Sequence, residues 1–179
     1  MSEWKSLLDE AVRRGDVSSE AGANIDLYLQ GANSPVGAAA IIELLEAGEW
    51  QEIDDRFFKT MAFGTGGLRG RTIGKIVTRA ERGVGGPLDR PQHPCVGTAS
   101  MNFFNLKRAM IGLVTYVKKT FSGEGRPSLV IGHDTRHFSR DFAETCAEVA
   151  INLGCDAYLF EAERGTPEIS FAVRYLRAN

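Results

Sequence analysis

The most constraining feature of this sequence is a strand, loop, helix and strand that follow one another between residues 128 and 160. Residues 128–132 (SLVIG) form a short apolar run typical of a buried strand, and residues 155–160 (CDAYLF) form a second. Residues 139–153 between them have helical spacing, and Gly154 ends that helix. Two strands joined in this way lie parallel in one sheet with a right-handed crossover, so the sequence predicts an α/β domain.

Helices are predicted on both sides of this unit. Apolar residues at helical spacing predict several short helices over residues 1–59. Residues 102–121 are apolar along one face of a longer helix. Thr166 and Pro167, as N-cap and first-turn proline, start a last helix that is expected to continue to Asn179.

Glycine and positive charge gather in one part of the chain. Nine of the 20 glycines lie in residues 64–97, where six Lys/Arg accompany two Asp/Glu, a net charge of +4. Residues 1–58 hold 4 Lys/Arg and 12 Asp/Glu, a net charge of −8. The whole chain has a net charge of −2, which argues against a nucleic-acid binder that relies on a strongly basic field. A cationic, turn-rich segment in an otherwise acidic chain suits an anionic ligand.

The sharpest motif is FGTGGLRG at residues 63–70. Its four glycines let backbone N–H groups converge on an anion, and Arg69 supplies a planar fork for phosphate or carboxylate. The glycine spacing differs from the Rossmann fingerprint, and Gly70 to Gly74-Lys75 has one residue too few for a P-loop, which disfavours a nucleotide-binding domain. A glycine-rich turn without function is the alternative interpretation.

Polar side chains also follow the first predicted strand. Asp134 and Arg136 lie at the carboxyl end of that strand, where open α/β sheets place their ligand groups. They are interpreted as an ion pair or turn cap, with Arg136 also able to face an anion. A metal site at His133 and Asp134 is disfavoured because no second His/Asp pair occurs, and no metal ligand is assigned.

Residues 83–94 (GVGGPLDRPQHP) predict a long surface loop, in which His93 and the adjacent Cys95 are expected to be solvated. Ser100 precedes a helix and could act as a nucleophile, although a serine at this place is more often a cap. Three cysteines without CxxC spacing indicate reduced thiols and a cytoplasmic protein. Neither a signal peptide nor a membrane span is predicted.

Several of these segments, in this order, resemble the α-D-phosphohexomutases, the phosphoglucomutase and phosphomannomutase superfamily: FGTGGLRG, MN before the long helix, IGHDTRHFSRDFA, YLF and TPEISFAVRYL. The resemblance covers residues 56–179 and implies a three-layer α/β domain with a mixed, mostly parallel sheet between helices. The helical N-terminal extension, residues 1–55, resembles the branch of bacterial phosphoglucomutases and the phosphoglucomutase-2 and phosphopentomutase type.

The resemblance also implies an activity. Members of the family have four domains, hold Mg²⁺, and move phosphate between the C1 and C6 hydroxyls of a sugar through a phosphoserine and a bisphosphorylated intermediate. Their phosphoserine loop, TASHNP, follows the segment that matches TPEISFAVR, so the nucleophile is expected beyond Asn179 and the 179 residues alone are expected to be inactive. The implied partners are a sugar phosphate, a sugar bisphosphate activator and the remaining domains of the same chain, with no nucleic acid and no membrane. The alternative function is a stand-alone sugar-phosphate-binding or regulatory module.

Site residues carry over from the family one by one. Four residues are implied to face the phosphoserine and the substrate phosphate: Thr65, Gly66, Gly67 and Arg69. Arg136 is a further implied phosphate ligand, and Asp134 supports it. Ser100, in TASMN, lies before the long helix rather than after it, so the position argues against its being the phosphoserine. It also replaces an Arg that the family has before MN.

Overall fold

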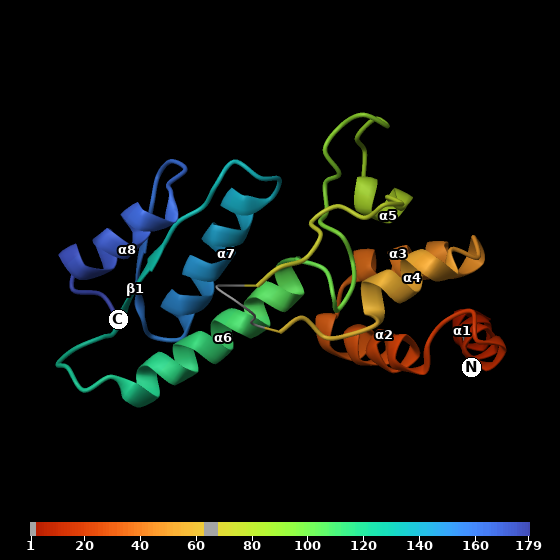
Figure 1. Cartoon of the computed structure of the whole chain (residues 1–179), viewed down its shortest axis with the longest axis horizontal. Coiled ribbons are helices and arrows are strands. Elements are labelled where there is room, and N and C mark those ends of the chain that lie inside the picture. The colour runs from red at the N-terminus through yellow and green to blue at the C-terminus, as the bar shows by residue number, and fades with distance from the viewer. Residues whose placement is uncertain (1–2, 63–67) are drawn as a thin grey trace. The chain divides into compact units, whose positions relative to one another are not determined.

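The computed structural model of the chain describes residues 3–62 and 68–179 (Figure 1). The chain divides into two compact units, residues 1–102 and residues 103–179, and each is described by itself. The domain boundary expected between residues 55 and 56 stays a prediction.

The first unit begins with helices that pack on one apolar core. They are α1 (Glu3–Arg14), α2 (Ser19–Ala32), α3 (Pro35–Glu46) and α4 (Trp50–Phe57). Ser18 and Ser34 fix two of the starts, because each side-chain oxygen accepts a hydrogen bond from the backbone N–H three residues later. The core between the helices includes the fully buried Ile25, Leu44 and Phe57. The predicted helical extension is confirmed.

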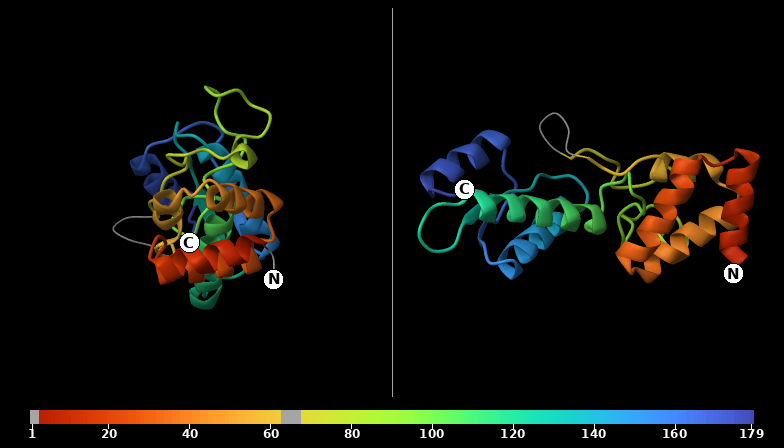
Figure 2. Two further views of the ribbon diagram at one scale, coloured as in Figure 1. Left: turned by 90° about the vertical axis from the view of Figure 1, so that its right-hand side faces the viewer. Right: turned by 90° about the horizontal axis from the view of Figure 1, so that it is seen from below.

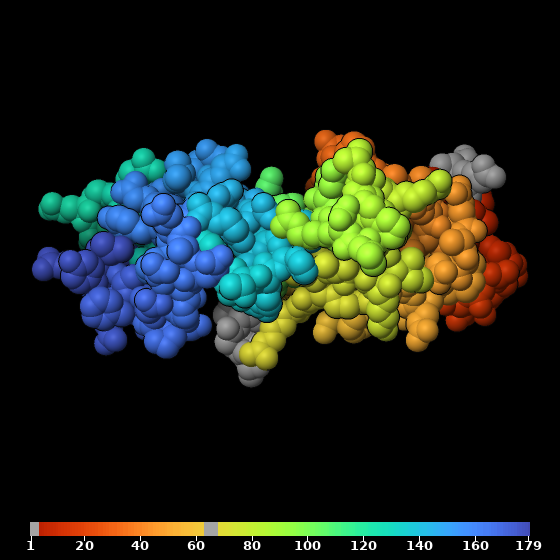
Figure 3. Space-filling model, turned by 90° about the horizontal axis from the view of Figure 1, so that it is seen from above, coloured from red at the N-terminus to blue at the C-terminus, as the bar shows by residue number. Residues whose placement is uncertain are grey.

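Residues 68–102 complete the first unit without a strand. Their one short helix, α5 (Arg79–Arg82), was not predicted, because four residues are too few for a periodic pattern. A capping box between Thr78 and Glu81 forms it, with each side chain bonded to the other residue's backbone N–H. Residues 83–90 then form an exposed loop, which faces the viewer in yellow-green in Figure 3. Two backbone hydrogen bonds close its base, from Gln92 to Arg82 and from His93 to Glu81.

The second unit has the predicted order of helices and strands. Its elements are α6 (Phe103–Thr120), β1 (Ser128–Ile131), α7 (Ser139–Asn152), β2 (Asp156–Leu159) and α8 (Thr166–Tyr175). The strands pair in parallel with Ser128 opposite Asp156. Helix α8 lies on one side of the strands, and α6 and α7 lie on the other (Figures 1 and 2). A buried cluster that includes Val114, Leu129 and Ala150 fills the space between helices and sheet. The three-layer α/β fold with a parallel sheet is confirmed.

The prediction for the last helix was wrong at both ends. Gly165, rather than Thr166, is the N-cap, and Glu168 bonds back to its N–H. The helix ends at Tyr175 rather than continuing, and the Asn179 N–H donates to the carbonyl of Ser128, the first residue of β1, at 2.9 Å. No helix in the described part of the chain is long and apolar enough to cross a bilayer.

Candidate anion site

The glycine motif is described in part. Thr65, Gly66 and Gly67 lie outside the described residues, whereas Arg69 is described and exposed. Next to it, Gly70 passes so close to a neighbouring segment that a Cβ there would lie 2.9 Å from Met101 N. A larger residue would push the two segments apart, which gives this glycine a packing role.

The neighbouring segment, residues 95–102, is bonded to the chain on both sides of the motif. On one side Met61 N donates to Thr98 O at 2.8 Å, and the Thr98 hydroxyl donates to Lys59 O at 2.8 Å. On the other side Met101 N donates to Arg71 O at 2.9 Å. The 95–102 segment therefore fixes the chain before and after FGTGGLRG relative to each other.

A buried arginine, Arg56, is bonded to the 95–102 segment. Arg56 is 0% exposed, and all three of its guanidinium nitrogens donate hydrogen bonds. Nε donates to Glu52 at 2.8 Å, Nη1 to Glu81 at 2.6 Å, and Nη2 to Ile76 O at 2.5 Å. A buried charge is tolerated only when it is paired and hydrogen-bonded in this way. Gly74 lets the chain cross the guanidinium, since a Cβ there would lie against Arg56 Nη2.

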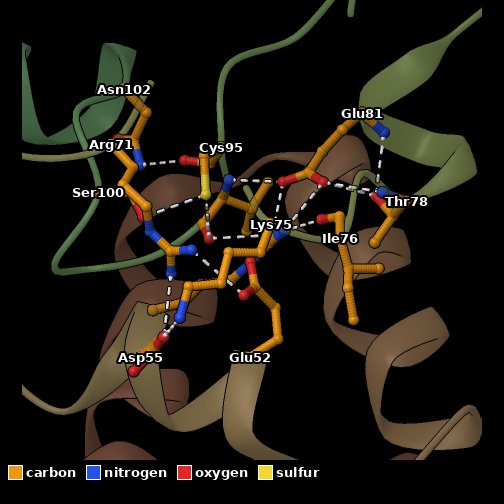
Figure 4. Close-up of polar contacts among 12 residues, drawn as sticks. Glu52, Asp55, Arg71, Lys75, Ile76, Thr78, Glu81, Cys95, Ser100 and Asn102 are labelled. Carbon is orange, nitrogen blue, oxygen red and sulfur yellow. Dashed lines mark hydrogen bonds and ion pairs between the residues drawn. The ribbon is translucent and has the colours of Figure 1, made fainter. Parts of the chain in front are cut away.

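Glu81 is the second centre of the same network, drawn in Figure 4. One carboxylate oxygen accepts from Arg56 and from Val96 N at 2.7 Å, and the other accepts from the backbone N–H and the hydroxyl of Thr78, each at 3.0 Å. The network thus ties α4, α5 and the 95–102 segment together through the two buried ion pairs of Arg56, with Glu52 and with Glu81. Sequence reasoning missed both residues, although the four-residue spacing of Glu52 and Arg56 on one helix is a signal for an ion pair.

Two of the cations counted in the glycine-rich region are paired with acidic side chains of α4. Arg71 Nη1 lies 3.3 Å from Glu52, and Lys75 Nζ lies 2.7 Å from Asp55. The hydrogen bond from Lys75 lowers the pKa of Asp55. The net charge of +4 in residues 64–97 therefore overstates the attraction of this region for an anion, because the charges of Arg71 and Lys75 are already paired within the protein.

Ser100 and Cys95 face each other inside the first unit. Their side-chain oxygen and sulfur are 3.2 Å apart, and the residues are 2% exposed each. Burial raises the pKa of the Cys95 thiol, which keeps it neutral. The expectation that Cys95 is solvated was wrong, because residues 94–98 are buried once the chain has left the exposed 83–90 loop. Ser100 is too enclosed to meet a substrate, in agreement with its interpretation as a structural residue.

In the second unit, Asp134 and Arg136 form the turn that follows β1. Asp134 accepts from the backbone N–H of Arg136 at 3.0 Å and from its Nε at 2.7 Å. The side chain of Arg136 is 78% exposed. The predicted ion pair is present, and the phosphate contact of Arg136 stays a prediction.

Arg140, at the start of α7, was missed by sequence reasoning. Its Nη1 donates to Phe160 O at 3.1 Å and Glu161 O at 2.6 Å, and it lies 3.2 Å from His133 Nε2. It therefore ties the turn after β1 to the turn after β2. Among the described residues, no group of three His, Cys, Asp or Glu side chains could hold a metal ion.

The Asp134 turn gives a testable pH dependence. Partial burial raises the pKa of Asp134, but hydrogen bonds from Arg136 and Ser139 outweigh it and hold the pKa below its usual value of 3.8. A depressed pKa means that the ionised form stabilises the fold above that pH, and that this stabilisation is lost as the pH falls through the folded pKa. We expect Arg136→Ala to raise the pKa of Asp134 toward 3.8 in an NMR titration of the carboxyl carbon. Arg174→Ala, on the exposed face of α8, is the control, and an unchanged pKa in Arg136→Ala would contradict the assignment.

The chain is similar in sequence to one protein family. Residues 95–179 match the family model described as phosphoglucomutase/phosphomannomutase, α/β/α domain I. A phosphoglucomutase of Staphylococcus haemolyticus is 31% identical over 123 residues, which are 69% of this chain and 18% of the relative. A phosphoglucomutase of Staphylococcus aureus is 28% identical over 151 residues, 84% of this chain and 22% of the relative. The chain thus spans about a fifth of the length of these relatives. No solved structure matches it.

Proposed function

We propose that the chain, whose residues 95–179 match domain I of the phosphoglucomutase/phosphomannomutase family, belongs to the α-D-phosphohexomutase superfamily and forms the first domain of an enzyme that interconverts sugar 1-phosphates and sugar 6-phosphates. The observation that carries this proposal is the match of residues 95–179 to domain I of the family, together with the phosphoglucomutase relatives. Residues 1–55 are proposed as its helical extension and residues 56–179 as the domain. The free cysteines support a cytoplasmic enzyme.

Phosphoryl transfer depends on positioning and on neutralising charge more than on covalent chemistry by the protein. In our proposal Arg69 supplies that charge next to the motif, with a fork that matches two phosphate oxygens. Thr65, Gly66 and Gly67 supply contacts of the same loop to the phosphoserine and the substrate phosphate. The exposure of Arg69, beside a segment held on both sides by hydrogen bonds, supports this role.

Arg136 is proposed as a further phosphate ligand, held by Asp134 at the carboxyl end of β1. Open α/β domains bind ligands at the carboxyl ends of their parallel strands. The exposed guanidinium of Arg136 at such an end supports the assignment.

The nucleophile and the metal are proposed to lie outside these 179 residues. The only serine here in a segment that resembles the phosphoserine loop is Ser100, which is buried and bonded to Cys95. Mg²⁺ does not fit the described residues, which offer no group of three suitable ligands, so no step is derived through it. The phosphoserine and the bisphosphate intermediate of the family remain part of the proposal for the whole enzyme.

Binding and turnover of the 179-residue chain test the proposal. We expect glucose 1-phosphate and inorganic phosphate to shift the backbone NMR signals of residues 68–71 with a Kd of about 1 mM, since one domain offers part of the contacts of a full site. We expect no conversion of glucose 1-phosphate to glucose 6-phosphate in an assay coupled to NADP⁺ reduction.

The other outcomes separate the alternatives. Turnover by the chain would contradict a nucleophile outside it. Micromolar affinity for a sugar phosphate without turnover would favour a stand-alone binding module. Binding of ATP or NAD in place of sugar phosphates would contradict the proposed substrate class.

A further inference from the structure

We propose that Arg56 is a positioning residue for Arg69: the buried guanidinium holds in place the chain segment from which Arg69 extends. This inference rests on the proposed function, because it assigns Arg56 a role in the geometry of the phosphate site. Arg56 itself is fully buried, so its side chain is not accessible to a ligand and its role is indirect.

The first link runs from Arg56 to the 95–102 segment. The Arg56 carbonyl accepts a hydrogen bond from Ala99 N at 2.9 Å, and Nη1 donates to Val96 O at 3.3 Å. Glu81, which Arg56 holds at 2.6 Å, accepts from Val96 N. Backbone and side chain of one residue thus fix two points of the 95–102 segment.

The second link runs from the 95–102 segment to the motif. Cys95 N donates to Thr72 O and Met101 N donates to Arg71 O, each at 2.9 Å. Gly70, between Arg69 and Arg71, passes within contact of the same segment. Arg69 therefore leaves the chain two residues before Arg71, whose carbonyl is anchored.

A side-chain route reaches the same place. Glu52 accepts from Arg56 with one oxygen and from Arg71 with the other, at 2.8 Å and 3.3 Å. The two routes, one through backbone hydrogen bonds and one through Glu52, converge on Arg71. Figure 4 shows Glu52 and Arg71 at this junction.

A lysine could keep the charge but not the geometry. The three nitrogens of Arg56 reach a carboxylate on α4, a carboxylate on α5 and the Ile76 carbonyl in separate directions. The single ammonium of lysine is a point charge and cannot reproduce a rigid fork. Arg56→Lys therefore tests the geometry with the charge retained.

Hydrogen exchange and binding, measured on the 179-residue chain, test the proposal together. In Arg56→Lys we expect the amides of Met61, Ala99 and Met101 to exchange at least about tenfold faster, while the α2 amide of Gly22 is unchanged. We expect the affinity for inorganic phosphate, read from the NMR shifts of residues 68–71, to fall about tenfold. Arg79→Lys, in the same unit with an 89% exposed side chain, is the matched control and should change neither measurement.

The outcomes distinguish positioning from general stabilisation. A variant with lower thermal stability, but with unchanged exchange at the three amides and unchanged phosphate affinity while folded, would overturn the proposal. Unchanged phosphate affinity despite faster exchange would overturn it as well. If Arg56→Lys does not fold, Glu52→Gln replaces it: it weakens the contacts of Glu52 with Arg56 and Arg71 but leaves the Arg56–Glu81 pair in place, and the same changes are expected in smaller size. If they are absent there, the proposal fails.

The proposed function can fail separately. If the unaltered chain binds no phosphate ligand, the phosphate site is wrong and Arg56 has no role in it. The exchange rates of Met61, Ala99 and Met101 then still decide whether Arg56 anchors the segment.

Discussion

Glu81→Gln is expected to lower the free energy of unfolding of the first unit by about 3 kcal/mol, although the two side chains have nearly the same shape. Both carboxylate oxygens of Glu81 accept two or more hydrogen bonds, one from Arg56 and Val96 N and the other from Thr78 and again Arg56. Whichever way the new amide turns, its NH₂ group faces donors, and Arg56 loses one of its two buried counter-charges.

Tryptophan fluorescence during urea unfolding measures this effect. Trp4 and Trp50 are the two tryptophans of the chain and both lie in the first unit, so the signal reports that unit. Glu46→Gln, at an exposed position of α3, is the matched control and should change the free energy of unfolding by less than about 0.5 kcal/mol. A loss below about 1 kcal/mol in Glu81→Gln would show that Glu52 alone compensates Arg56.

Arg69→Ala is expected to weaken phosphate binding by the chain about 10-fold to 100-fold, with little change in stability. Hydrogen bonds between an arginine and a phosphate contribute about 1.5–3 kcal/mol, which corresponds to that range. The exposed position of Arg69 predicts a change in the free energy of unfolding within about 0.5 kcal/mol. Arg69→Lys should restore little of the affinity, because lysine cannot make the bidentate contact.

NMR titration with glucose 1-phosphate, followed by urea unfolding of the same samples, checks both parts of this prediction. Arg79→Ala is the control for the removal of one exposed cation from the same unit. Equal losses of affinity and stability in Arg69→Ala would mean that the glycine motif is structural. Full rescue by Arg69→Lys would mean that general charge attraction, rather than a fork, holds the ligand.

The second unit could be predicted from sequence because its signals are local. Apolar runs at 128–132 and 155–160, and the Gly154 that ends the helix between them, determine strands, helix and parallel pairing. The end of α8 was not predictable in this way. Arg177 takes a left-handed conformation (φ 52°) and Ala178 N donates to Val173 O, so the helix ends in a cap that is usually made by glycine, and no glycine is present to reveal it.

The buried network of Arg56, Glu52 and Glu81 could not be predicted from the sequence, for a different reason. Glu52 and Arg56 have the spacing of an ordinary surface ion pair, and the sequence does not reveal that α5 and the 95–102 segment cover them. Local composition misled the interpretation of Cys95 in the same way, since the loop before it is rich in glycine and proline. The motif itself identified Arg69, whose phosphate contact is still to be tested.

Because hydrogen bonds close the base of the 83–90 loop, the length of this loop can change while the rest of the first unit keeps its structure. Backbone hydrogen bonds from Gln92 to Arg82 and from His93 to Glu81 join the two ends of the loop just outside the buried network. Lengthening such a loop is inexpensive, about 0.6 kcal/mol for each doubling. Insertions and deletions can therefore accumulate between Gly83 and Arg90 during evolution while Arg56 keeps its partners. The same site suits the grafting of a reporter peptide.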